Sequence, residues 1–153
     1  MIQPIPAGYH TVTPYLIIKN AAAAIEFYKK AFNAIEMARM PAPNGMIGHA
    51  ELKIGDSMIM LADEFPEMDA KGPETFGGSP MSIMLYVEEA DKIFQQAIDA
   101  GAKILRPLEN KFYGDRSGQI TDPFGYVWSI ATHVEDVTPA EMERRMKEMG
   151  EKK

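Results

Sequence analysis

One pair of side chains in this sequence has the types and the spacing for acid–base chemistry. His49 and Glu51 lie two residues apart in the segment 49–54, where they alternate with Ala50 and Leu52. Side chains of a strand point alternately to its two faces, so the apolar residues face a core and the imidazole and carboxylate share the other face. There the pair could contact one bound molecule, or it could be a solvated pair on an exposed sheet.

A second candidate is the guanidinium of Arg116, which follows a loop with the sequence YGDR at 113–116. An arginine at the mouth of a cavity binds a carboxylate or a phosphonate through two parallel hydrogen bonds. The alternative is an ion pair between Asp115 and Arg116 that only fixes the turn. Tyr113 either lines the same mouth or covers the core.

Composition excludes several kinds of function. The sequence contains no cysteine, so disulfides, thiolate nucleophiles and cysteine zinc sites are ruled out. The net charge of −6 argues against a nucleic-acid-binding surface, which needs a basic face. No segment approaches the roughly 18 apolar residues of a membrane helix, and the N-terminus lacks the pattern of a secretion signal. The sequence therefore predicts a cytoplasmic protein with no nucleic-acid or membrane partner.

The chain contains an internal repeat. Residues 16–34 have the pattern of a strand followed by an amphipathic helix, and residues 85–102 repeat it 69 positions later. Farther along, strand–turn–strand segments surround Gly55 and Gly125, which are 70 positions apart. A nearly constant offset across several elements predicts two βαβββ modules.

We expect a single α+β domain that covers residues 1–153. Module one covers about residues 8–63 and module two about residues 80–134, and an irregular linker rich in proline and glycine joins them at 64–79. A capping pattern and a stripe of methionines predict a final helix at about 139–149. The residues expected at helix termini are Asn20, Gly101, Thr138, Pro139 and Gly150.

A series of short motifs runs through the chain. They are AIEFYKKAF at 24–32, HAEL at 49–52, FPEM at 65–68, GGSP at 77–80, YGDR at 113–116, DPFG at 122–125 and THVED at 132–136. In this order they resemble the vicinal oxygen chelate superfamily, which includes glyoxalase I, bleomycin- and fosfomycin-resistance proteins and extradiol dioxygenases. Within it the sequence is most similar to the PhnB-like branch, and the resemblance spans nearly the whole chain.

The resemblance implies a fold in which the strands form a curved mixed sheet around a cavity, with the helices on its convex face. It also implies a homodimer with cavities near the interface. Members that use a metal hold a divalent ion with His and Glu side chains on the concave face. The superfamily hosts several chemistries, so the fold alone does not give the function.

Counting from the motifs carries the family's metal-ligand positions onto this sequence. They fall on Thr13, Ser82, Ser129 and a residue near Ile59 or Met60. None of these is His, Asp or Glu, and neutral hydroxyls and thioethers are poor ligands for Zn²⁺, Mn²⁺ or Fe²⁺. We therefore expect no cofactor and no metal site of the family's usual type.

Strand alternation predicts a cavity lining that mixes polar and apolar groups, as pockets for small organic molecules do. The expected lining residues are Thr13, Tyr15, His49, Glu51, Ser82, Met84, Tyr113, Arg116, Gln119 and Ser129. The favoured hypothesis is a glyoxalase- or bleomycin-resistance-like protein that binds a small organic ligand without a metal. The alternative is a divalent-metal-dependent lyase or dioxygenase whose rearranged site uses His49 and Glu51. A third possibility is a regulatory or interaction module whose cavity is filled by its own side chains.

Overall fold

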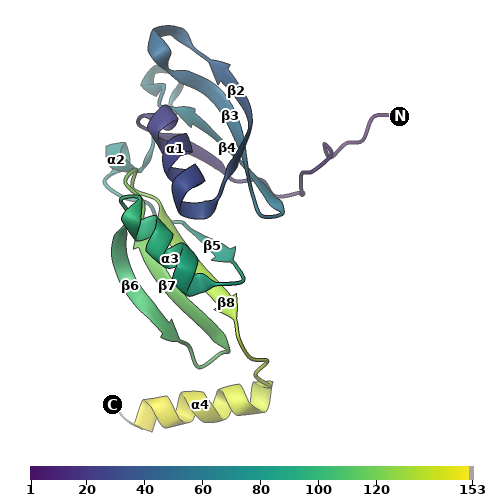
Figure 1. The fold of residues 1–153 in the computed structure, drawn as a ribbon, viewed down its shortest axis with the longest axis vertical. Helices are drawn as coiled ribbons and strands as arrows, with labels where there is room; N and C mark the ends of the chain where they lie inside the picture. Colours follow the sequence, from purple (N-terminus) through teal and green to yellow (C-terminus); the bar gives the residue numbers. More distant parts are fainter. Residues whose placement is uncertain (152–153) are drawn as a thin grey trace.

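The computed structural model describes residues 1–151 and contains two four-stranded sheets. The strands are β1 Tyr15–Ile18, β2 Ile35–Pro41, β3 Ile47–Ile54, β4 Ser57–Asp63, β5 Ser82–Tyr86, β6 Lys103–Asn110, β7 Asp115–Thr121 and β8 Val127–His133. Sheet 1 has the order β1-β4-β3-β2 and sheet 2 the order β5-β8-β7-β6. In each, the first strand runs parallel to its neighbour and the remaining pairs are antiparallel. The repeated order confirms an α+β fold of two βαβββ modules, one above the other in Figure 1.

Each sheet has one helix packed on one side. The helices are α1 Ala21–Phe32, α2 Pro73–Phe76, α3 Ala90–Asp99 and α4 Pro139–Glu151, with 3-10 turns at Pro43–Gly45 and Pro66–Met68. Helix α1 packs on sheet 1 and α3 on sheet 2, and the two helices contact each other. We call the side of each sheet away from its helix the open face. Within residues 1–151 no helix is long and apolar enough to cross a membrane.

Both helix-terminal predictions for the repeated helices are confirmed. The Asn20 side chain accepts a hydrogen bond from the N–H of Ala23 at 3.3 Å, which satisfies one donor at the start of α1. After α3, Gly101 adopts a φ of 121° directly beyond the cap residue Ala100. That conformation is cheap only for glycine, so the residue ends the helix.

A buried polar group joins the two modules. Asp122, which is 3% exposed, accepts hydrogen bonds from the Tyr28 hydroxyl of module one at 2.6 Å and from the Trp128 indole N–H at 2.9 Å. It also accepts the backbone N–H groups of Phe124 and Tyr126. Burial raises the pKa of Asp122, although these hydrogen bonds act in the opposite direction. The DPFG turn therefore fixes module one against module two.

The segment between the modules is more ordered than the irregular linker that the sequence predicts. It contains a 3-10 turn and α2, and the buried Glu64 carboxylate accepts the Gly72 N–H and the Thr75 hydroxyl, each at 2.6 Å. These hydrogen bonds lower the pKa of Glu64. A Cβ on Gly72 would lie 2.4 Å from the Ile17 carbonyl oxygen, so this glycine allows the segment to pack directly on β1.

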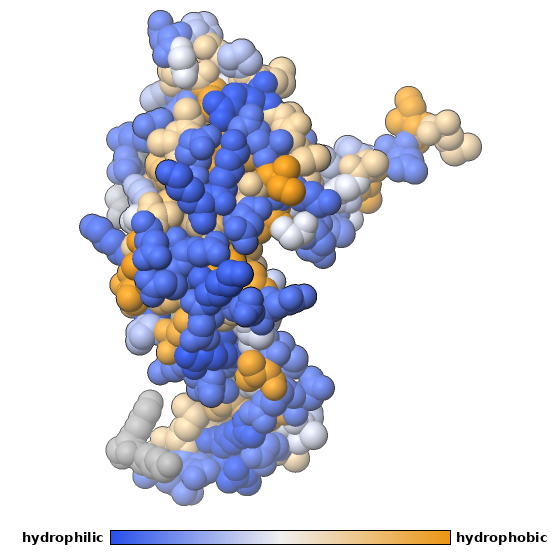
Figure 2. All heavy atoms as spheres, viewed as in Figure 1, coloured by the Kyte–Doolittle hydropathy of each residue, from blue (hydrophilic) through white to orange (hydrophobic). Residues whose placement is uncertain are grey.

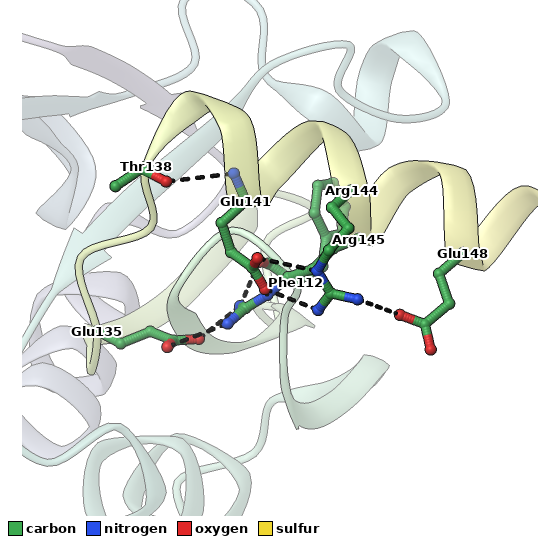
Figure 3. A network of polar contacts seen from close by, with 7 residues as sticks. All are labelled: Phe112, Glu135, Thr138, Glu141, Arg144, Arg145 and Glu148. Atoms are coloured by element: carbon green, nitrogen blue, oxygen red, sulfur yellow. Dashed lines mark hydrogen bonds and ion pairs between the residues drawn. The ribbon is translucent and has the colours of Figure 1, made fainter.

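Helix α4 stands apart from both sheets, at the lower end of Figure 1. It starts where the capping pattern predicts, and the Thr138 hydroxyl accepts the Glu141 N–H at 3.2 Å. Its predicted end is wrong: Gly150 does not adopt a positive φ, and the helix continues to Glu151. Figure 3 shows how Arg145 ties the helix to the Phe112 carbonyl and to Glu135.

The methionine stripe of α4 is not covered within the chain. Met146 and Met149 are 56% and 50% exposed, and no residue of the helix is buried. Instead the ion pair between Arg145 and Glu135 ties the helix to the segment after β8. Within the helix, Arg144 and then Arg145 lower the pKa of Glu141 to about 2. The expected packing face is therefore exposed in the single chain.

Candidate ligand-binding site

Three polar side chains of the predicted set meet on the open face of sheet 1. The Tyr15 hydroxyl oxygen lies 2.8 Å from His49 Nδ1, and His49 Nε2 lies 3.0 Å from Glu51 Oε2. Tyr15 comes from β1 and the other two from β3, with β4 between them. We call these three residues the Tyr15 cluster. The sequence places each of them on this face but does not reveal that they contact one another.

Strand register explains how the cluster spans three strands. Tyr15 pairs with Met60 of β4, and Met60 pairs with Glu51 of β3. Two positions along, the β4 residue is Ala62, next to His49 and only 4% exposed. A short side chain at this position leaves room above the sheet, so the rings of Tyr15 and His49 approach to 5.5 Å between centroids.

The cluster is neither buried nor fully solvated. Tyr15 is 46% exposed, and the side chains of His49 and Glu51 are 23% and 25% exposed. Partial burial raises the pKa of Tyr15. Met40 lies opposite His49 on β2, and Lys53 follows on the same face of β3. Strand alternation along β3 would have predicted Lys53 on this face. Met40 could not be predicted, because its place depends on the pairing of β2 with β3, which the sequence does not specify.

Sheet 2 carries the equivalent positions without titratable groups. Met84 pairs with Ser129, and Ser129 pairs with Gln119, whose amide donates to the Ser129 hydroxyl at 2.9 Å. These residues are the counterparts of Tyr15, Met60 and Glu51. Extending the 70-residue offset of Gly55 and Gly125 to β3 and β7 is therefore wrong by two residues, because Glu51 corresponds to Gln119 and their offset is 68. The cause is the connection before the last strand, which is 122–126 in module two and only 55–56 in module one.

Four predicted lining residues lie away from the Tyr15 cluster. The Arg116 guanidinium forms a bidentate ion pair with Asp91 of α3, at 2.7 and 2.9 Å, so it is engaged on the helix side of sheet 2. Tyr113 packs edge-on against Phe112 in the loop before β7. Thr13 precedes β1, and its hydroxyl donates to the His10 carbonyl at 3.3 Å. Ser82 is exposed at the first position of β5, on the same edge strand as Met84.

The large cavity of about 1030 Å³ does not coincide with the Tyr15 cluster. It lies at the junction of the modules, between the end of α1, the β3–β4 turn, β5 and the start of α3. Of the ten predicted lining residues only Met84 borders it. It borders the edge strand β5 of sheet 2, including the open-face residues Met84 and Tyr86.

The donor set does not fit the divalent ion that metal-dependent members of the fold use. Register now selects Met60 as the fourth inherited position, beside Thr13, Ser82 and Ser129. These positions offer hydroxyls and a thioether, which are poor ligands for such ions. Within residues 1–151 no three His, Asp or Glu side chains are grouped so that they could hold a metal. No chemical step is therefore derived through a metal.

A second histidine lies at the end of sheet 2, and it predicts a pH-dependent stability. His133 Nδ1 is 2.8 Å from buried Asp115, which also accepts the Tyr86 hydroxyl, and His133 Nε2 is 2.7 Å from Asp136. Hydrogen bonding to Asp136 and then to Asp115 raises the pKa of His133. A raised folded pKa means that the stabilisation is complete below about pH 6.5 and is lost as the pH rises through the higher folded value.

Thermal unfolding measured from about pH 6 to about pH 9 should therefore show a fall in Tm that is smaller in His133→Gln. His10→Gln is the matched control, because His10 is exposed and its imidazole lies 3.3 Å from a neutral group, the Asp56 carbonyl. Equal pH slopes in the wild type and in His133→Gln would contradict this assignment.

Comparison with known proteins identifies the family. The sequence model of the Glyoxalase/Bleomycin resistance protein/Dioxygenase superfamily matches residues 9–130. An uncharacterised protein of Mycobacterium bovis is 40% identical over 143 residues, which cover 92% of this chain and 94% of that protein. An Arabidopsis thaliana gene product of solved structure has a TM-score of 0.65 at 26% identity, covering 80% of this chain and 98% of its own.

A fosfomycin resistance protein from Listeria monocytogenes, solved with Mn(II) and a dihydroxypropylphosphonic acid, has a TM-score of 0.62. It is 17% identical, with 90% of this chain and 97% of that chain covered, so it shows the fold alone. The Tyr15 cluster lies on the open face of this known fold. Its tyrosine, histidine and glutamate side chains supply polar donors and acceptors on that face. The chain belongs to the glyoxalase/bleomycin resistance protein/dioxygenase superfamily.

Proposed function

We propose that this protein binds a small organic molecule on the open face of sheet 1, without a metal. The observation that carries the proposal is the Tyr15 cluster itself. It offers a phenol, an imidazole and a carboxylate that two hydrogen bonds hold in place. Around it lie methionines of β2 and β4, and a few fixed polar groups on an apolar surface are the usual make-up of a ligand site.

A second copy of the chain completes the site in this proposal. Large apolar side chains are half exposed on both open faces, with Tyr15 at 46%, Met40 at 60% and Met84 at 47%. The helix-bearing side seen in Figure 2 is mostly hydrophilic, with hydrophobic residues in separate spots. Contiguous apolar surface on a protein is usually covered by a partner or a ligand. Pairing of the open faces would enclose the ligand between two chains.

The test is ligand-induced stabilisation of the full chain, screened against glycopeptides of the bleomycin type and against flat aromatic molecules. A ligand at a hundred times its Kd stabilises the folded state by about 2.7 kcal/mol, which raises Tm by roughly 5–10 °C. The shift should vanish in His49→Ala and persist in Gln95→Ala, which changes an exposed residue of α3. Sedimentation analysis of the same samples should show a dimer. No shift with any compound at about millimolar concentration would overturn the proposal.

The alternative of a rearranged metal site uses His49 and Glu51, which are the adjacent nitrogen and oxygen donors of the cluster. Metal analysis of protein purified without a chelating tag separates metal-free binding from this metal-dependent alternative. Less than about a tenth of an equivalent of Zn, Mn, Fe or Ni, with no gain on reconstitution, would end the alternative, because a functional site needs near-stoichiometric metal. The cytoplasmic location and the PhnB-like placement stay predictions.

A further inference from the structure

The Tyr15 cluster is a continuous chain of hydrogen bonds that ends in the hydroxyl of a half-exposed tyrosine. Its links are 2.8 Å from the Tyr15 hydroxyl to His49 Nδ1 and 3.0 Å from His49 Nε2 to Glu51 Oε2. The Glu51 carboxylate contacts one nitrogen of the imidazole, and the Tyr15 phenol contacts the other. A carboxylate, an imidazole and a hydroxyl in this order form the general arrangement that activates a hydroxyl oxygen as a base or a nucleophile.

The order of donors and acceptors fixes the tautomer of the imidazole. An ionised carboxylate can only accept, so the short contact to Glu51 requires the proton on His49 Nε2. His49 Nδ1 is then left with a lone pair, and it accepts the Tyr15 hydroxyl proton. The two lone pairs of the Tyr15 oxygen then point away from the imidazole, so they can accept a proton from a molecule on the open face.

We propose that the Tyr15 oxygen is a general base that removes a proton from a carbon acid bound on the open face of sheet 1. The carbon–hydrogen bond of the substrate breaks and its proton moves to Tyr15. The original phenol proton moves to His49 Nδ1, and Glu51 stabilises the resulting imidazolium. The carbon electron pair enters an adjacent electron-withdrawing group or expels a leaving group, and the imidazolium later returns its proton to water or product.

The surroundings of the cluster favour this chemistry. Burial raises the pKa of Tyr15, so the phenol keeps its proton at rest and takes a new one only as it passes its own to the imidazole. The residues beside it on β4, Met60 and Ala62, are apolar, which suits a substrate with little charge. A base in such surroundings contributes about 10²–10⁴-fold to proton transfer.

The activity is assigned to module one alone. In module two the corresponding positions are Met84 and Gln119, and the Gln119 amide donates to a serine. No proton can be passed along that pair at neutral pH, because neither group titrates there. The other open-face tyrosine, Tyr86, donates to the Asp115 carboxylate and has no imidazole acceptor. Tyr86 therefore lacks the imidazole partner that Tyr15 has.

The test uses 5-nitrobenzisoxazole as the probe, since removal of the proton on C3 of its isoxazole ring breaks the N–O bond and releases a coloured cyanophenolate. The full chain should accelerate this elimination over buffer by at least about 10²-fold at neutral pH. Tyr15→Phe should abolish the acceleration, and Gln95→Ala, which changes an exposed residue of α3, should retain it. Equal rates for the wild type and Tyr15→Phe would overturn the proposal.

Glu51→Gln separates a relay from a merely structural cluster. It keeps the size of the side chain and a hydrogen-bond acceptor but removes the charge that stabilises the imidazolium, so kcat for the probe should fall while KM stays unchanged. An unchanged kcat in Glu51→Gln would also overturn the relay.

The inference rests on the proposed ligand site, and the experiment distinguishes the two. Indazole has the shape of the probe but no cleavable N–O bond, and its binding is followed by NMR shifts of the Tyr15 and His49 rings. Binding of indazole with no acceleration of the probe would overturn the relay and leave the proposed function intact. No acceleration of the probe, together with no stabilisation by any compound of the ligand screen, would overturn both.

Discussion

Replacement of Asp122 by alanine is expected to lower the free energy of unfolding by about 3–5 kcal/mol. The carboxylate is 3% exposed and accepts four hydrogen bonds, from the Tyr28 hydroxyl, the Trp128 indole and two backbone N–H groups. Each buried donor left without an acceptor costs about 1–3 kcal/mol, and partial relaxation reduces the sum. Urea unfolding followed by Trp128 fluorescence measures the loss.

Asp99→Ala is the matched control for that experiment. Asp99 is an exposed carboxylate on α3 whose hydrogen bond comes from Gln95, one turn earlier. Its removal should change stability by less than about 0.5 kcal/mol. A loss of less than about 1 kcal/mol in Asp122→Ala would contradict the claim that this turn holds the modules together.

Substitution of Gly114 by alanine is expected to destabilise the protein by about 2–4 kcal/mol and to release the C-terminal segment. Gly114 has a φ of 103°, and a Cβ there would lie 2.2 Å from the Glu135 carbonyl oxygen. The Gly114 carbonyl also accepts the N–H groups of Val134 and Glu135. A displaced Glu135 would no longer meet Arg145, which anchors α4. Thermal unfolding and limited proteolysis between β8 and α4 report the two effects.

Gly77→Ala separates backbone strain from steric clash. Gly77 also has a positive φ, 86°, but no atom lies within 4 Å of the position of an added Cβ. Strain alone should cost about 1–2 kcal/mol there, with no change in proteolysis at the C-terminus. The same proteolysis pattern in Gly114→Ala and Gly77→Ala would show that the close approach to Glu135 does not hold the C-terminal segment.

The two modules differ in chemistry although they share one strand order. Module one carries the Tyr15 cluster, and module two carries the amide–hydroxyl pair of Gln119 and Ser129 at the corresponding place. At these corresponding positions only module one has titratable groups. Proton transfer through the cluster is therefore proposed for module one alone.

Arg116 shows where residue type alone misleads. A guanidinium after a glycine turn suggested recognition of an anionic ligand, and the alternative was a pair with neighbouring Asp115. In the structure the guanidinium binds Asp91 of α3, and Asp115 is buried against Tyr86 and His133. Sequence spacing cannot reveal such a partner, since it comes from a helix that packs on the strand only after folding.

The sequence by itself determined the two-module fold and the faces on which His49 and Glu51 lie. Those conclusions follow from alternation, periodicity and residue type, which are local properties of the chain. Only the tertiary structure decided that Tyr15 meets His49, that Gln119 corresponds to Glu51, and that the large cavity lies elsewhere. These depend on strand order, register and turn length, because each brings together residues that are distant in sequence.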